Sequence, residues 1–248
     1  MSFLRNALLC TALLAAPSGW AQSDMSDAER AALHAEIRGY LLENPEIIME
    51  VIGILDERRA LGEAAAEASL VTDNSSAIYD DGYSFVGGNP DGDITIVEFV
   101  DYQCGFCRKS HPEVRELISA DGGIRLIVKE LPILGPGSEL ASRAAISTLI
   151  SEGPEAYERL NLALMTLQGQ VTEASLNGAL SEAGLDVATI RAGMDADEVT
   201  RRLQDTRGLA QALAISGTPT FVFGDRMVRG YVELAAMRGL VEGLRATN

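Results

Sequence analysis

Two cysteines, Cys104 and Cys107, form the motif CGFC shortly after the apolar run ITIVEFV that begins at Ile94. A pair so close in sequence is a poor structural disulfide, because the small loop it closes barely restricts the unfolded chain. A structural zinc site needs about four ligands, and the chain has only two histidines to add to these thiols. Two interpretations remain: a two-coordinate Cu(I) site, since thiolates are soft ligands, and redox catalysis.

Redox catalysis fits the surroundings of the pair better, because CGFC follows a predicted strand and opens a predicted helix. At a helix N-terminus, unpaired backbone N–H groups and the helix dipole favour a thiolate at Cys104. Arg108, Lys109 and His111 are expected to add positive charge nearby. The pKa of such a cysteine falls to roughly 3.5–7.5. Cys104 would then attack a substrate disulfide, and Cys107 would resolve the mixed disulfide.

The N-terminal segment predicts export. Residues 1–21 contain one basic residue, Arg5, then an apolar core and a small-residue ending, the pattern of a secretory signal peptide cleaved after Ala21. Cleavage would remove the third cysteine, Cys10. Export together with a retained cysteine pair indicates an oxidising compartment.

Charge and hydropathy limit the partners. The formal net charge of −16 disfavours nucleic acid and anionic lipid. No stretch after the leader is apolar for long enough to span a bilayer, so no membrane insertion is expected.

Residues 22–70 are predicted to be helical. Ser26 to Glu29 fits a capping box, and Asn44-Pro45 predicts a break, with Asn44 as the cap of a second helix and Pro45 at its first position. Residues 71–82 are polar and are predicted to be a linker.

The rest of the chain, residues 83–248, alternates between strand and helix patterns. Three strand-like runs surround the CGFC helix, and a long helical block follows. A hairpin with Gly224-Asp225 at its turn and a helix from Glu233 to about Leu244 complete the pattern. This order predicts an α/β sheet with a helical insertion at about 138–205.

The segment VEFVDYQCGFC and the distant GTPTFVF together resemble the thioredoxin superfamily, in its exported DsbA-type branch, over about residues 83–244. The resemblance implies a thioredoxin fold with a helical insertion. It also implies that Pro219 is cis beside the cysteines and helps keep metal off the thiols, while Thr218 offers its backbone to an extended substrate. Neither a cofactor nor a bound metal is expected.

Glu98 interrupts the strand six residues before Cys104. Strand alternation alone would place it in solvent. The family has a buried acid at the matching position, which helps to move the proton of the second thiol, and this implies a catalytic Glu98 with a raised pKa. The segment from Lys129 to Ala145 is similar to a ScsC-like and Com1-like sub-branch, in which it either packs near the active site or is only structural.

An apolar stripe on the second N-terminal helix needs a covering surface. Its members are Ile47, Ile48, Val51, Ile52 and Leu55. It could dock on its own catalytic domain or on copies of itself. The surrounding sequence resembles the N-terminal extension of ScsC-like proteins, which favours a homo-oligomer, with a trimer preferred, formed through residues 26–70.

The expected function is a periplasmic thiol–disulfide oxidoreductase, an oligomeric isomerase or reductase, acting on unfolded or misfolded exported proteins and reset by a membrane redox partner. Thr218 before Pro219 favours isomerase activity, since isomerase relatives often have threonine there. The alternatives are a monomeric DsbA-type disulfide oxidase and a non-enzymatic Cu(I)-binding protein.

Overall fold

The structure, a computed structural model, describes residues 25–247. The predicted signal peptide, its cleavage site and Cys10 lie outside these residues. No helix between residues 25 and 247 is both long enough and apolar enough to cross a membrane. The helices are α1 (Asp27–Glu43), α2 (Glu46–Asp73), α3 (Ser75–Tyr79), α4 (Gly105–Asp121), α5 (Pro136–Glu152), α6 (Pro154–Thr166), α7 (Glu173–Glu182), α8 (Val187–Gly193), α9 (Asp197–Ala212) and α10 (Leu234–Thr247). The strands are β1 (Phe85–Gly88), β2 (Ile94–Val100), β3 (Ile124–Glu130), β4 (Thr220–Phe223) and β5 (Arg226–Arg229).

The chain divides into two compact units between Arg58 and Arg59. In the first unit the predicted capping box is confirmed: the Ser26 hydroxyl accepts from the Glu29 backbone N–H, and the Glu29 side chain accepts from the Ser26 N–H. The prediction for Asn44 is wrong. Its side-chain amide donates to the Tyr40 carbonyl at 2.8 Å, so it ends α1 instead of capping α2.

The second unit begins inside α2, and the predicted linker at residues 71–82 is not extended. Helix α2 continues to Asp73, and α3 follows after a single residue. Val71 and Ile78 are buried in a core with residues of the sheet. The polar residues of this stretch form its exposed face, while the apolar Val71 and Ile78 anchor it in the core.

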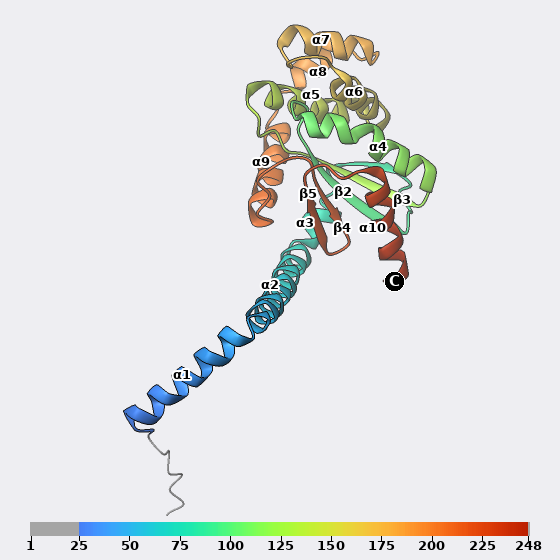
Figure 1. The fold of residues 1–248 in the computed structure, drawn as a ribbon. Coiled ribbons are helices and arrows are strands. Elements are labelled where there is room, and N and C mark those ends of the chain that lie inside the picture. The colour runs from blue at the N-terminus through green and yellow to red at the C-terminus, as the bar shows by residue number, and fades with distance from the viewer. Residues whose placement is uncertain (1–24, 248) are drawn as a thin grey trace, which may run out of the picture. The chain divides into compact units, whose positions relative to one another are not determined.

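Five strands form one mixed sheet within the described chain, in the order β1-β3-β2-β4-β5 (Figure 1). Strands β2 and β3 are parallel, and the other neighbouring pairs are antiparallel. The predicted hairpin is confirmed as β4–β5, with Gly224 at positive φ between the strands.

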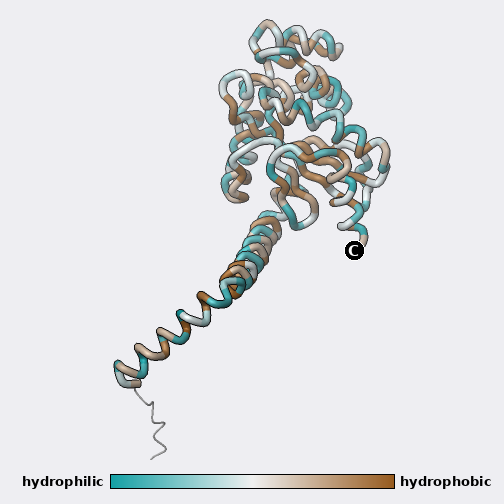
Figure 2. The backbone as a smooth tube through the Cα atoms, in the orientation of Figure 1, coloured by the Kyte–Doolittle hydropathy of each residue, from teal (hydrophilic) through white to brown (hydrophobic). Residues whose placement is uncertain are grey.

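Each face of the sheet has its own helical cover. Alternate residues of a strand point to opposite faces: Ile96 packs with residues of α4 and α10, whereas Val97 and Phe99 pack with residues of α3 and α9. In Figure 2 the strands are drawn mostly in brown, as expected for a sheet that is buried on both faces.

The helical insertion predicted at about 138–205 extends from α5 to α9. Helices α5–α8 gather on the same side of the sheet as α4 (Figure 1), and they share one buried core with both cysteines. The insertion therefore supplies one wall of the region around CGFC.

Candidate active site

The turn between β2 and α4 sets the position of the cysteines. The buried Asp101 side chain accepts from the Gln103 N–H at 2.7 Å, and from the N–H groups of Ile133 and Leu134 at 2.8 and 3.0 Å. Cys104 is the N-cap residue of α4. Asp101 thus ties the loop after β3 to the start of the catalytic helix, in agreement with the expectation that this segment packs near the active site.

The hairpin strand β4 brings the late proline to the cysteines. Strand β4 pairs with β2, the Thr218–Pro219 peptide bond before it is cis, and the Cys104 thiol donates to the Thr218 carbonyl at 3.0 Å. Both cysteines are free and buried. The fold therefore places residues more than a hundred positions apart in sequence in direct contact.

The two thiols differ strongly in acidity. The pKa of Cys104 is lowered to about 5, first by a hydrogen bond from the Cys107 thiol and also by the Thr218 side chain and the backbone N–H groups of Cys107 and Phe106. The same thiol–thiol hydrogen bond, followed by burial, raises the pKa of Cys107. At neutral pH the pair thus consists of a Cys104 thiolate and a Cys107 thiol.

The basic side chains near CGFC contribute less than expected. The pKa of His111 is lowered to about 4 by burial and by the charge of Arg115, so the prediction of a positive charge there is wrong. Arg108 donates to the carbonyls of Tyr102 and Gly169, and Lys109 lies over the Tyr231 ring at 3.8 Å. Hydrogen bonds at the helix N-terminus, more than nearby charge, account for the acidity of Cys104.

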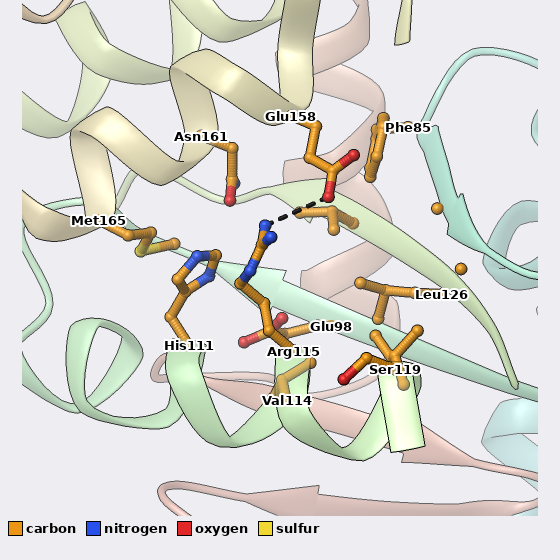
Figure 3. A pocket seen from close by; sticks show the side chains of 14 residues that line it. Phe85, Glu98, His111, Val114, Arg115, Ser119, Leu126, Glu158, Asn161 and Met165 are labelled. Atoms are coloured by element: carbon orange, nitrogen blue, oxygen red, sulfur yellow. Dashed lines mark hydrogen bonds and ion pairs between the residues drawn. The ribbon is translucent and has the colours of Figure 1, made fainter. Parts of the chain in front are cut away.

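Glu98 is buried, with 3% of its surface exposed. Burial, and then the charge of Glu130, raises its pKa to about 8. Its carboxyl faces a cavity of about 300 Å³ between strands β1–β3 of the sheet, α4 and α6, together with His111 and Arg115 (Figure 3). The negative charge of Glu98 also contributes to the raised pKa of Cys107.

Sequence reasoning did not select Glu130, which is equally buried. Its carboxylate accepts from the hydroxyls of Tyr102, Tyr157 and Ser142 at 2.8, 2.6 and 2.7 Å. The signal was present: Glu130 interrupts the apolar run of β3 just as Glu98 interrupts that of β2. The tyrosines carried no such signal, since isolated aromatic residues are ordinary core components.

The Cys104 thiol should ionise with a midpoint near pH 5, because its thiolate accepts the hydrogen bonds described above. A folded-state pKa below the unfolded value of about 8.5 stabilises the reduced protein above pH 8.5, and this contribution is lost as the pH falls to 5. Thiolate absorbance near 240 nm measures the midpoint, and Cys104→Ser supplies the baseline. A midpoint above pH 7 would contradict the assigned geometry.

A mixed sheet with a cis-proline beside a CxxC helix and a helical insertion defines a DsbA-like thioredoxin protein. The family of DSBA-like thioredoxin domains matches residues 95–242, more than half of the chain, and the chain belongs to that family. A second family, described as the copper resistance protein ScsC N-terminal domain, matches residues 29–60.

Solved structures agree with this assignment. A thioredoxin-like oxidoreductase from Silicibacter pomeroyi is 38% identical and covers 69% of this chain and 97% of its own, with a TM-score of 0.66. A linker-deletion mutant of Proteus mirabilis ScsC is 26% identical and covers 92% and 100%, with a TM-score of 0.69. The thiol-disulfide exchange protein alpha-DsbA2 from Wolbachia pipientis is 26% identical and covers 74% and 98%, with a TM-score of 0.70.

Curated relatives match over part of their length. The Na(+)/H(+) antiporter NhaA 1 of Salinispora arenicola is 28% identical over 167 residues, which are 63% of this chain. The chain spans about a quarter (24%) of the length of the curated relatives it matches.

Proposed function

We propose that this chain is a periplasmic protein thiol–disulfide oxidoreductase that self-associates through α1 and the first half of α2 and acts as a disulfide isomerase or reductase. The observation that carries the proposal is the reduced CGFC pair, in which the Cys104 sulfur lies 3.0 Å from the Thr218 carbonyl. The pKa of Cys104 is lowered and that of Cys107 is raised. Disulfide exchange requires this difference, because one thiolate attacks the substrate and the second thiol reacts later, when it resolves the mixed disulfide.

The reaction begins with attack of the Cys104 thiolate on one sulfur of a substrate disulfide. A mixed disulfide forms, and the second substrate sulfur leaves as a thiolate. In isomerisation the substrate thiolate attacks a second disulfide of the same substrate protein. Another thiolate of that protein then attacks the mixed disulfide and releases Cys104. In reduction Cys107 gives its proton to Glu98 and attacks Cys104, which releases the reduced substrate and leaves the disulfide of CGFC for a membrane partner to reduce.

Unfolded or misfolded exported proteins are the substrates that suit this site. The Thr218 carbonyl, when Cys104 is a thiolate, is free to accept from the backbone N–H of an extended chain, a contact that does not depend on substrate sequence. Phe106 lies between the two cysteines and is 60% exposed. An apolar side chain beside the nucleophile favours the exposed apolar segments of a misfolded protein.

The N-terminal unit supports self-association. Apolar side chains along it remain exposed, among them Ile37, Ile48 and Ile52 at 48%, 46% and 44%, and brown segments recur along α1 and α2 in Figure 2. A largely apolar groove of about 680 Å³ lies between α1 and the start of α2. Copies of the same helices would cover these residues, as helices with apolar seams do, and would join several CGFC pairs in one assembly.

Isomerase activity should depend on this surface. Ile48→Lys with Ile52→Lys places charges in the apolar stripe, and we expect a monomer by light scattering. We also expect scrambled ribonuclease to be reactivated at least about tenfold more slowly, because the monomer loses the gain of about 10²–10⁴ that multivalent binding can provide. Oxidation of reduced ribonuclease should persist, because the CGFC unit is unchanged.

The matched control is Glu50→Lys with Glu57→Lys, which adds the same residue type to the polar side of the helix. It should keep both the assembly and the isomerase activity. A wild-type chain that is monomeric and oxidises ribonuclease without reshuffling it would instead identify a DsbA-type oxidase. Substitution suits this experiment better than truncation at Val71, which would remove Glu67, an acceptor for the Met227 N–H at 2.7 Å.

A further inference from the structure

Two buried carboxyl groups lie on one face of the sheet. Glu98 is on β2 and Glu130 is on β3, where the parallel register pairs Glu98 with Val128 and Val100 with Glu130. Because alternate residues point to the same face, both carboxyls point to the face that is covered by α4 and by helices α5–α8 of the insertion. They are 3% and 5% exposed.

The two carboxyls have unequal surroundings. Both oxygens of Glu130 accept hydrogen bonds: Tyr102 and Tyr157 donate to Oε1, and Ser142 donates to Oε2. No group within residues 25–247 makes a hydrogen bond to the carboxyl of Glu98, which faces the cavity shown in Figure 3. Hydrogen bonds to a carboxylate favour its charged form, whereas burial without them favours the neutral acid.

This asymmetry decides which of the two glutamates ionises first. Burial raises the pKa of Glu130 to about 7, and its three hydroxyl donors limit that rise. Burial and the Glu130 charge together raise the pKa of Glu98 to about 8. When two neighbouring acids have unequal environments, the better-solvated one ionises first and holds the proton on the other.

We propose that Glu130 is a positioning residue for disulfide exchange: its carboxylate, held by three hydroxyls, makes the Glu98 carboxylate beside Cys107 a stronger proton acceptor. The inference rests on the proposed function, in which Glu98 exchanges a proton with the second thiol. Tyr157 and Ser142 belong to the helical insertion, on α6 and α5, and Tyr102 precedes CGFC. The insertion thereby acts on the chemistry of the cysteines through Glu130.

The step affected is resolution of the mixed disulfide. The Cys107 proton passes to the Glu98 carboxylate, and the Cys107 sulfur attacks the Cys104 sulfur. A Cys104–Cys107 bond forms, the bond from Cys104 to the substrate breaks, and the substrate leaves as a thiolate that takes a proton from water. Two electrons pass from the cysteine pair to the substrate.

Other titratable or charged groups also face the two acids. Those around Glu98 are Cys107, His111 and Arg115 of α4 and Glu158 of α6. Those around Glu130 are Asp101, Tyr102, Tyr157, Tyr83 and Arg202. Arg115 pairs with Glu158 at 3.2 Å, and Arg202 pairs with Glu198 at 2.7 Å. Glu130 is the group whose charge contributes to the raised pKa of Glu98.

Glu130→Gln tests the proposal, because glutamine keeps an oxygen for the two tyrosines and offers an N–H to Ser142 while it removes the charge. The reduced full chain is mixed with a substoichiometric aromatic disulfide, dithiobis(nitrobenzoate), across a pH series. The first thionitrobenzoate released reports attack by Cys104, and the second reports resolution by Cys107. We expect the pH midpoint of the second release to fall by about one unit, the effect of a neighbouring charge at an effective dielectric near 20. The first release should be unchanged.

Three further variants isolate the effect. Glu98→Gln should abolish the inflection, and adding Glu130→Gln to it should change nothing more. Tyr157→Phe removes one donor without altering the packing and should shift the midpoint downward by a smaller amount. This variant decides the question if Glu130→Gln does not fold.

An unmoved or raised midpoint in the folded variant would overturn the proposal, since a merely structural Glu130 would change stability and not the pH profile. Failure of the proposed function looks different: the wild-type chain would show no second release or would not exchange disulfides with proteins.

Discussion

Cys104→Ser should abolish thiol–disulfide exchange, with rates falling by at least about 10³-fold to the uncatalysed level. The wild-type Cys104, with a pKa of about 5, is roughly 99% thiolate at pH 7. A serine hydroxyl stays protonated at this pH and cannot form a mixed disulfide. The measurement is reduction of insulin and reactivation of scrambled ribonuclease by the full chain.

Cys107→Ser is the matched control for this prediction. It keeps a hydroxyl that can donate to the Cys104 sulfur, so the attacking thiolate persists while resolution is lost. Mixed disulfides with substrate proteins should accumulate and be visible by non-reducing electrophoresis. Exchange that survives Cys104→Ser, or mixed disulfides on Cys107 in that variant, would overturn the assignment of the nucleophile.

Lys129→Met should destabilise the protein by about 3–5 kcal/mol, the cost typical of breaking a buried ion pair by removing one partner. The Lys129 ammonium lies 2.5 Å from an Asp81 carboxylate oxygen, and the two side chains are 0% and 9% exposed. Without the lysine, the Asp81 carboxylate keeps hydrogen bonds from Ser84 and the Tyr83 N–H but has no countercharge. Urea unfolding of the reduced protein measures the loss.

The pH dependence of this loss follows from the pKa of Asp81, which is lowered in the folded protein despite the opposing effect of burial, because Lys129 and Ser84 donate to it. A lowered pKa contributes stability above the unfolded value of about 3.9, and this contribution disappears as the pH falls through the folded value. The difference in free energy of unfolding between wild type and Lys129→Met should therefore become smaller below about pH 4. Adding Asp81→Asn to Lys129→Met should recover much of the lost stability. A free energy of unfolding for Lys129→Met alone that lies within about 1 kcal/mol of the wild-type value would contradict the prediction.

The chemistry of this protein could be predicted from local sequence because its signals are local. A strand, a CxxC pair and a helix follow one another directly, and the helix N-terminus acidifies whichever cysteine begins it. The hairpin around Gly224 is equally local, since its turn requires a residue that accepts positive φ. For such features the sequence neighbours are also the spatial neighbours.

Errors arose where two structures compete for the same residues. Asn44 lies between α1 and α2 and could cap the end of the first helix or the start of the second. Its hydrogen bond to the Tyr40 carbonyl shows that it caps the end of α1. The segment at 71–82 is polar in composition, but Val71 and Ile78 reach a core made by distant strands. Burial, and then the charge of Arg115, lowers the pKa of His111 to about 4, so its imidazole is neutral where its sequence neighbours suggested a positive charge.

By itself, the sequence placed the cysteine pair between a strand and a helix and indicated the DsbA-like branch of the thioredoxin superfamily. Only the tertiary structure decided how acidic Glu98 and Glu130 are, because their burial and the hydrogen-bond donors of Glu130 come from residues distant in the chain. Glu98 and Glu130 show the difference: two glutamates interrupting two apolar strands look alike in sequence. The three hydroxyls around Glu130 come from the insertion and from the turn before CGFC. They stabilise the charge of Glu130, and that charge makes Glu98 the stronger proton acceptor of the two.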